Sequence, residues 1–306
     1  MKPLLVILIL LCCCGKNHVN PVDSTDVVEP LPDAVDSTDV VEPLPYDVKN
    51  FFIWSEAKNN AGEICVVFVE KNDLSADGYV VHYQKYKNNL KMEDDVIFDA
   101  WKKQTFVDSK NFDIVLDDSG YAHFVCGGEN DDCLYLTNSP DLKWKTRHVL
   151  SPKYPYRFGR TNKISLDGNR IDIVTSADYT VGGGYIFSAM FRIKGEIGNG
   201  PLEESLITAN VAIYGEYVYN FEISNRYNRL IIIYSLSLFG GRYSSRIICS
   251  VDYLSSDKFI YKELENKWGY GRRVCIINEE ESQIIVSVEG NNYLLFIKNG
   301  EIISEK

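Results

Sequence analysis

Residues 227–251 read YNRLIIIYSLSLFGGRYSSRIICSV, in which an apolar run, a glycine-containing loop and a second apolar run follow one another. Short runs rich in β-branched and aromatic residues, bounded by turn residues, are typical of β-strands. The stretch therefore predicts two antiparallel strands joined by a loop, and the rest of the chain can be interpreted from this unit.

The same pattern occurs four more times. The copies read GEICVVFVEKNDLSADGYVVHY from Gly62, GYAHFVCGGENDDCLYL from Gly120, GNRIDIVTSADYTVGGGYIFSAMF from Gly168 and ESQIIVSVEGNNYLLFI from Glu281. Repetition at a period of tens of residues indicates units that bury apolar faces against their neighbours. The spacing suits four-stranded blades of a β-propeller better than two-stranded solenoid rungs. We therefore predict an all-β fold with five blades, or six if residues 209–219 form a partial blade.

Each repeat divides into four strands with no long helical pattern. The innermost strands are expected near residues 50–55, 111–116, 161–165, 218–223 and 272–277. The loops between second and third strands are expected at 71–77, 127–132, 176–183, 236–242 and 289–291.

Charge is unevenly distributed along the 306 residues, whose net charge is −11. Residues 17–48 hold eight acidic residues and no Lys or Arg, whereas the remainder from Lys49 holds 30 basic and 35 acidic residues. A mildly acidic folded part argues against nucleic acid as a partner, because phosphate binding needs a basic surface. After residue 16 no stretch is long and apolar enough to span a bilayer.

The first residues, MKPLLVILILLCCCGK, combine Lys2, an apolar run and three cysteines. This segment resembles a bacterial lipoprotein signal peptide over residues 1–14. The resemblance implies a lipid anchor, with palmitate or a similar acyl chain on Cys14, and a place in the cell envelope, at the outer membrane or cell surface. Cys12 and Cys13 stand where smaller residues are usual, so which cysteine is acylated stays open. The alternatives are an ordinary secretory signal or a short membrane anchor.

Residues 15–48 contain the same eleven residues twice, VDSTDVVEPLP at 22–32 and at 35–45. Proline and acidic residues dominate the segment, so it cannot bury enough apolar surface to fold alone. We expect a disordered tether followed by one propeller domain over 49–306. The alternative is that the tether carries a binding motif for a partner.

Residues 116–150 resemble a repeat of the sialidase-like (BNR-type) propellers. The matching residues are Asp117, Gly120, His123, Tyr135 and Trp144, whereas the strict Asp-box Ser-x-Asp-x-Gly-x-x-Trp is absent. The resemblance implies the propeller fold, and it makes a sialidase- or glycosidase-like hydrolase one possible function.

Two segments expected to connect blades, KYPYRFGR at 153–160 and KWGYGRR at 267–273, interleave aromatic and arginine residues. Aromatic rings stack on sugar faces, and arginine binds a carboxylate with two parallel hydrogen bonds. The predicted ligand-binding residues are Tyr154, Tyr156, Arg157, Tyr179, Arg242, Trp268 and Tyr270. The alternative is aromatic packing between blades with solvated arginines.

Cys126 and Cys133 flank the loop GGENDD, where opposed strand residues come within disulfide range. A bridge is expected in an exported protein, and two buried thiols are the alternative. His and Cys residues lack the spacing of a zinc site, so we expect no metal and no cofactor.

The leading functional hypothesis is a lipid-anchored propeller that binds a glycan or an envelope protein on one face without catalysis. A sialidase- or glycosidase-like hydrolase is the first alternative. A scaffold within an envelope complex is the second.

Overall fold

The computed structural model describes residues 53–71, 79–101, 112–128, 132–145, 147–150, 156–157, 161–181, 185–197, 202–208, 216–227, 229–238, 244–253, 259–268, 273–298 and 301–305. In these residues all regular secondary structure is β-strand. The described part of the chain contains no helix long and apolar enough to cross a membrane. The predicted signal peptide with Cys14, and the tether over 15–48, lie outside the described residues.

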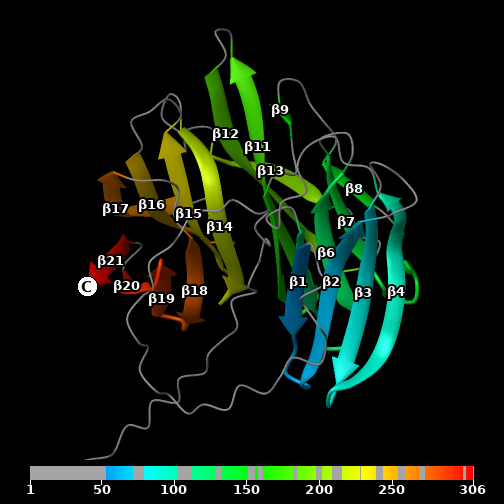
Figure 1. Ribbon diagram of the computed structural model, residues 1–306. Coiled ribbons are helices and arrows are strands. Elements are labelled where there is room, and N and C mark those ends of the chain that lie inside the picture. The colour runs from blue at the N-terminus through cyan, green and yellow to red at the C-terminus, as the bar shows by residue number, and fades with distance from the viewer. Residues whose placement is uncertain are drawn as a thin grey trace, which may run out of the picture.

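The strands in the described residues form five sheets, each made by consecutive antiparallel strands from one repeat (Figure 1). The first sheet contains β1 (Ile53–Lys58), β2 (Glu63–Lys71), β3 (Tyr79–Lys87) and β4 (Leu90–Trp101). The second contains β5 (Phe112–Leu116), β6 (Ala122–Gly127), β7 (Cys133–Thr137) and β8 (Arg147–Leu150). The third contains β9 (Tyr156–Arg157), β10 (Asn162–Asp167), β11 (Arg170–Val181), β12 (Tyr185–Glu196) and β13 (Glu203–Thr208). The fourth contains β14 (Glu216–Arg226), β15 (Arg229–Leu238), β16 (Ser244–Tyr253) and β17 (Phe259–Trp268). The fifth contains β18 (Val274–Glu279), β19 (Gln283–Val288), β20 (Asn291–Lys298) and β21 (Glu301–Glu305).

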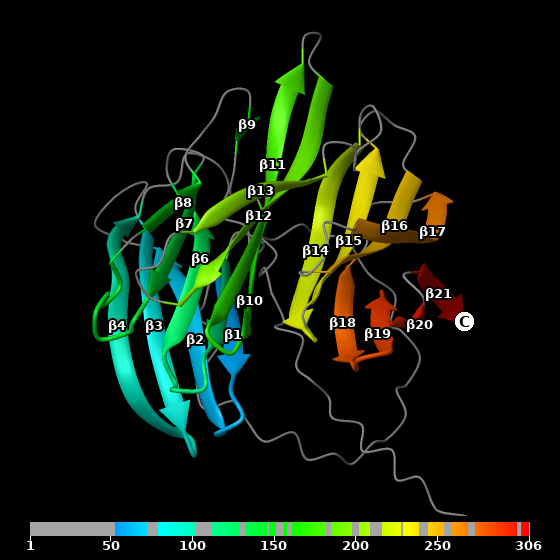
Figure 2. The same cartoon turned by 180° about the vertical axis from the view of Figure 1, so that it is seen from behind.

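The predicted hairpins therefore appear as four-stranded units, with one difference in the third sheet. Residues 176–181, which the sequence places in a loop, continue strand β11, and the short strand β9 pairs with this extension. The long β11–β12 hairpin projects beyond the other sheets in Figures 1 and 2. Tyr179, expected in a loop, is therefore a strand residue.

The cores lie between successive sheets, as the strand alternation predicts. In β6, Ala122, Phe124 and Cys126 pack in a core shared with the first sheet, whereas Val125 packs in a core shared with the third. Ile233 of β15 packs against the fifth sheet in the same way. Successive side chains of a strand point to opposite faces, so every central sheet serves two cores.

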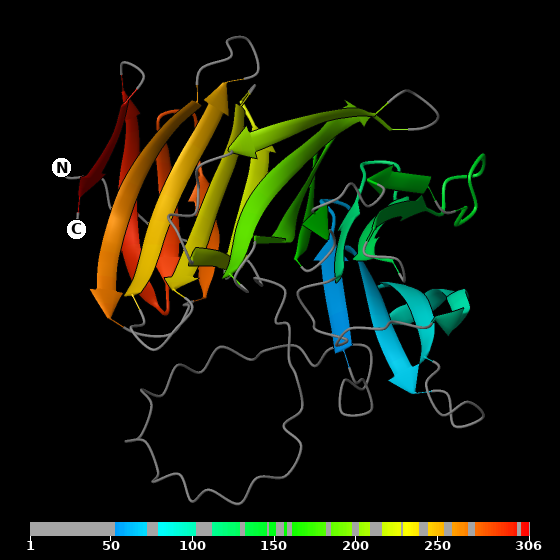
Figure 3. The ribbon, with the colours of Figure 1, turned by 90° about the horizontal axis from the view of Figure 1, so that it is seen from above.

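The innermost strands β1, β5, β10, β14 and β18 contact one another in this order. No comparable contact joins β18 to β1 among the described residues. Figure 3 shows the first and fifth sheets at opposite ends of the series. The structure thus shows five successive sheets whose innermost strands are neighbours.

The predicted disulfide between Cys126 and Cys133 is wrong. In the β6–β7 hairpin Cys126 lies opposite Leu134, and Cys133 lies opposite Gly127. This offset of one residue sends the two thiols into different cores, on opposite faces of the sheet. Both thiols are buried, and the Sγ atom of Cys133 donates a 3.4 Å hydrogen bond to Asn162 Oδ1.

Candidate functional site

Three charged residues occupy matching positions on three successive innermost strands. Asp113 of β5 lies opposite Val125, Lys163 of β10 opposite Val174, and Glu222 of β14 opposite Ile233. Each of these partners is an apolar residue that faces the next sheet. Because cross-strand partners share a sheet face, each charged side chain also points toward the next sheet.

Lys163 joins the two carboxylates of this triad. Its Nζ atom lies 2.7 Å from Glu222 Oε1 and 3.7 Å from Asp113 Oδ1. The other oxygen of Asp113, Oδ2, accepts a 2.9 Å hydrogen bond from the backbone N–H of Ile164. The triad therefore connects the second, third and fourth sheets beside their innermost strands.

The triad is largely withdrawn from water. The side chains of Lys163, Asp113 and Glu222 are 9%, 17% and 30% exposed, respectively. Burial, opposed by the Lys163 ammonium and aided by the negative charge of Glu222, raises the pKa of Asp113 to about 6. Burial alone would lower the pKa of Lys163, but the two carboxylates outweigh it and the pKa is raised.

This arrangement has the chemical elements of an acid–base site. Asp113 Oδ1 lies 3.7 Å and Glu222 Oε1 lies 2.7 Å from Lys163 Nζ, so the two carboxylate oxygens are at most about 6.4 Å apart. That limit is compatible with the carboxyl separation in retaining glycosidases, roughly 5–5.5 Å. A carboxyl group whose pKa is about 6 can donate a proton near neutral pH, and the more exposed Glu222 is the carboxylate that a ligand can approach.

Of the seven ligand-binding residues predicted from sequence, two face each other across strands. Tyr156 of β9 lies opposite Tyr179 of β11, and Arg157 lies opposite Asp178. On the same edge of β11, Val174 pairs with Lys163. Val174 precedes Asp178 by four residues, so the two pairs are separated by about 13 Å along the strand. The aromatic pair and the triad therefore share the innermost edge of the third sheet.

The structure does not place the remaining four predicted residues with Tyr156, Arg157 and Tyr179. Trp268 ends β17, the outermost strand of the fourth sheet, and Figures 1 and 2 both show β17 apart from β9. Tyr154, Arg242 and Tyr270 lie outside the described residues.

Sequence reasoning missed the triad, although a signal exists. Residues 112–114 read Phe-Asp-Ile and residues 221–223 read Phe-Glu-Ile, so each acid stands between large apolar residues of a predicted innermost strand. Residues 162–164 read Asn-Lys-Ile in the corresponding strand of the repeat between them. A charge at a half-buried strand position needs a partner, and here the partners come from neighbouring repeats.

The residues that resemble the BNR repeat have structural contacts instead. His123 is buried and lies between Asp117 Oδ2, at 3.2 Å from Nε2, and the hydroxyl of Tyr135, at 2.7 Å from Nδ1. Burial of Asp117 opposes its ionisation, but hydrogen bonds from His123 and from the Tyr121 N–H hold its pKa below the ordinary value. Trp144 Nε1 donates to Asp95 Oδ2 at 3.1 Å, which ties the second sheet to the first.

No family model and no curated protein matches this sequence. Among solved structures, the GH93 α-L-arabinofuranosidase of Fusarium graminearum in complex with arabinobiose is similar, with a TM-score of 0.50 and 9% identity over 86% of this chain and 82% of that chain. An α-L-arabinanase of Penicillium chrysogenum has a TM-score of 0.48 and 11% identity over 86% and 82% of the two chains. A puromycin-hydrolysing peptidase of Mycobacterium tuberculosis has a TM-score of 0.48 and 10% identity over 81% and 38%.

At these identities the similarity concerns the fold alone. The arabinofuranosidase has a β-propeller fold, and the five successive antiparallel sheets described above are consistent with the same architecture. The class defined by the fold is thus an all-β, propeller-like protein.

Proposed function

We propose that this protein is a five-bladed β-propeller that hydrolyses a glycosidic bond at the Asp113–Lys163–Glu222 triad. The observation that carries the proposal is the placement of two carboxylates around one ammonium on three successive innermost strands. In a closed ring these strands surround the axis. The fold similarity to an α-L-arabinofuranosidase supports a saccharide as the substrate class.

Each residue of the triad has a role in this proposal. Asp113, whose pKa is about 6, protonates the oxygen of the leaving sugar as a general acid. Glu222 attacks the anomeric carbon or activates a water molecule, depending on the carboxyl separation in the substrate complex. Lys163 positions the Glu222 carboxylate through their 2.7 Å contact.

The test is hydrolysis by the purified full chain of a panel of aryl glycosides, with α-L-arabinofuranoside and sialoside among them. Glu222→Gln and Asp113→Asn should each lower kcat/KM by at least about 100-fold. Glu280→Gln, at an exposed acid in the turn between β18 and β19, is the matched control and should leave kcat/KM unchanged. Absence of turnover on every substrate would contradict the proposal, as would full activity in Glu222→Gln.

A second candidate function is glycan binding without hydrolysis. The backbone pairing of Tyr156 with Tyr179 favours it, because tyrosine is a residue type that stacks on sugar rings. Saturable binding of a glycan that the chain never cleaves, weakened by Tyr156→Ala, would select this function over the first. A scaffold role in an envelope complex would instead require a protein partner that is retained on the purified domain.

We further propose that the domain is held at the cell envelope by an acyl chain on Cys14 and the tether over 15–48. The support is the sequence pattern of residues 1–16 and the repeated acidic, proline-rich segment. Metabolic labelling with a palmitate analogue should tag the wild type. Cys14→Ser should lose the label, and labelling that persists would move the site to Cys12 or Cys13.

A further inference from the structure

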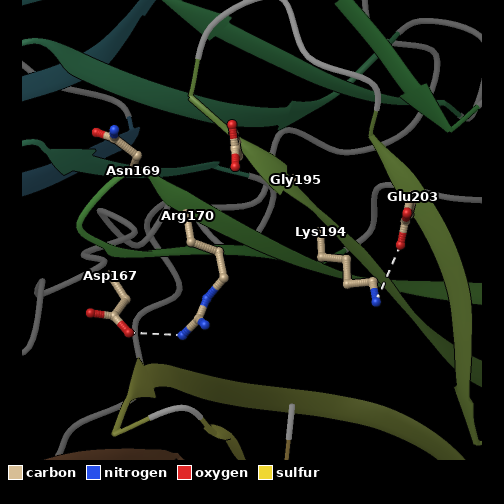
Figure 4. Close-up of a pocket in the computed structure, with 7 residues that line it drawn as sticks. Asp167, Asn169, Arg170, Lys194, Gly195 and Glu203 are labelled. Atoms are coloured by element: carbon tan, nitrogen blue, oxygen red, sulfur yellow. Dashed lines mark hydrogen bonds and ion pairs between the residues drawn. The ribbon is translucent and has the colours of Figure 1, made fainter. Parts of the chain in front are cut away.

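A cavity of about 550 Å³ opens at the end of the third sheet, where the β10–β11 turn lies beside the end of β12 and the start of β13 (Figure 4). Small-molecule sites generally occupy 300–1,000 Å³. Lys163 lies near the start of β10, whereas Asp167 of the cavity ends it, about 13 Å farther along the strand. The cavity is therefore separate from the triad.

Arg170 is the most firmly held residue of the cavity. Its Nη2 atom donates to Asp167 Oδ2 at 2.8 Å and to Asn225 Oδ1 at 2.6 Å. Asn225 and its hydrogen-bond partner Asp172 are fully buried, so the support beneath the guanidinium is rigid. A guanidinium has five N–H donors, and these contacts use only the Nη2 pair. The Nη1 donors have no acceptor among the described residues and remain available to a ligand.

The other charged groups of the cavity provide both donors and acceptors. Lys194 Nζ pairs with Glu203 Oε2 at 3.2 Å, and Figure 4 shows this pair across the cavity from Arg170 and Asp167. Glu196 also lines the cavity and has no ion-pair partner in the described part of the chain. A negatively charged ligand would meet this carboxylate, and a positively charged ligand would meet the guanidinium of Arg170. A neutral ligand with several hydroxyl groups, each a donor and an acceptor, satisfies both kinds of group.

We propose that this cavity is a second saccharide-binding site, specific for a neutral sugar unit. The choice of a saccharide rests on the proposed function, whereas the preference for a neutral ligand rests on the charges of the cavity itself. Such a site would hold a distant part of the same glycan whose bond is cleaved at the triad.

The experiment is a titration of the full-length wild-type chain with D-galactose, L-arabinose, D-galacturonate and D-galactosamine. Two-dimensional amide NMR spectra monitor each titration. The neutral sugars should shift the amides of Gly195 and Glu196 with a Kd on the order of 1 mM. Lys194→Met, which removes a donor, and Asn169→Trp, which adds bulk at an exposed lining residue, should each weaken binding about tenfold. Lys262→Met, at an exposed lysine of β17, is the matched control and should bind as the wild type does.

Two results would overturn the proposal. One is the absence of shifts at the cavity with every sugar, or shifts unchanged in both Lys194→Met and Asn169→Trp. The other is tighter binding of D-galacturonate or D-galactosamine than of D-galactose, which would refute the neutral specificity. Monosaccharides contain no glycosidic bond, so their binding here does not depend on hydrolysis. Binding at this cavity combined with no glycosidase activity would reject the proposed function but would still support this site.

Discussion

The ammonium of Lys163 lies 2.7 Å from the carboxylate of Glu222, across the boundary between the third and fourth sheets. The contact joins side chains that are 59 positions apart in the sequence and that occupy corresponding positions in two repeats. One lysine thereby bridges two inter-sheet boundaries, because Asp113 approaches it from the second sheet. A charged group at such a withdrawn position needs a partner, and here two neighbouring sheets each provide a carboxylate.

Lys163→Met is expected to destabilise the protein by about 3–5 kcal/mol, because it leaves two largely buried carboxylates without their shared cation. Urea unfolding at pH 7 measures the change. Lys163→Arg preserves the charge and should lose less. The loss in Lys163→Met should shrink at pH 5, where Asp113 is mostly protonated. An equal loss at both pH values would show that the charges are not coupled.

Asp113 should make stability depend on pH in an unusual direction. Its pKa is about 6 in the folded protein and 3.8 as the ordinary value, so the folded state binds this proton more tightly. The free energy of unfolding contributed by this group therefore falls as the pH rises from about 4 to about 6. Asp113→Asn removes the effect. The stability of the variant relative to wild type should rise by up to roughly 3 kcal/mol between pH 4 and pH 7. A constant difference across this range would contradict the pKa shift.

Phe124→Ala should cost about 3–5 kcal/mol, because the ring is fully buried between the first and second sheets. Leu90, on the outermost strand of the first sheet, is 68% exposed, and Leu90→Ala should change stability by less than about 0.5 kcal/mol. Thermal and urea unfolding of the two variants provide the comparison. Similar losses in both would mean that the strand register is incorrect.

Gly120 and Gly62 form a matched pair of glycines in the left-handed backbone region, with φ values of 80° and 76°. A Cβ atom at Gly120 would lie 2.5 Å from Glu63 Oε2, whereas at Gly62 it would meet nothing within 4 Å. Both alanine variants should lose about 1–2 kcal/mol to backbone strain. Gly120→Ala should lose more, because the Glu63 carboxylate is also hydrogen-bonded to Asn59. Equal melting temperatures for the two variants would exclude the contact with Glu63.

The repeats could be predicted from the sequence because strand and turn signals are local. The alternation of Ala122, Phe124 and Cys126 with Val125 is evident from this short segment alone. It is confirmed by the two different cores in which these residues pack. The cysteine pair could not be predicted, since an offset of one residue in the hairpin moves a thiol to the opposite face. Residues 176–181 became strand because each of them pairs with a residue of β12, and β9, which lies earlier in the chain, adds two pairs at Asp178 and Tyr179.

The triad could be predicted only in part. In the sequence, each acid is a charged residue between apolar residues. Its partner, however, is set by which innermost strands are neighbours in the fold, and the three residues come from three repeats. The aromatic and arginine segments stand out by their composition alone, and composition does not distinguish an innermost edge from an outermost strand. For that reason Tyr156 and Tyr179 lie opposite each other, whereas Trp268 lies on another sheet edge.

The measurement that tests the central claim most directly is the pH dependence of kcat/KM for the best aryl glycoside, in the wild type and in Asp113→Asn. If Asp113 is the general acid, wild-type activity should fall about tenfold per pH unit above an apparent pKa of about 6. That decline should be absent from the residual activity of Asp113→Asn. A decline that is unchanged in the variant, or no turnover by the wild type at any pH from about 4 to 8, would contradict the account.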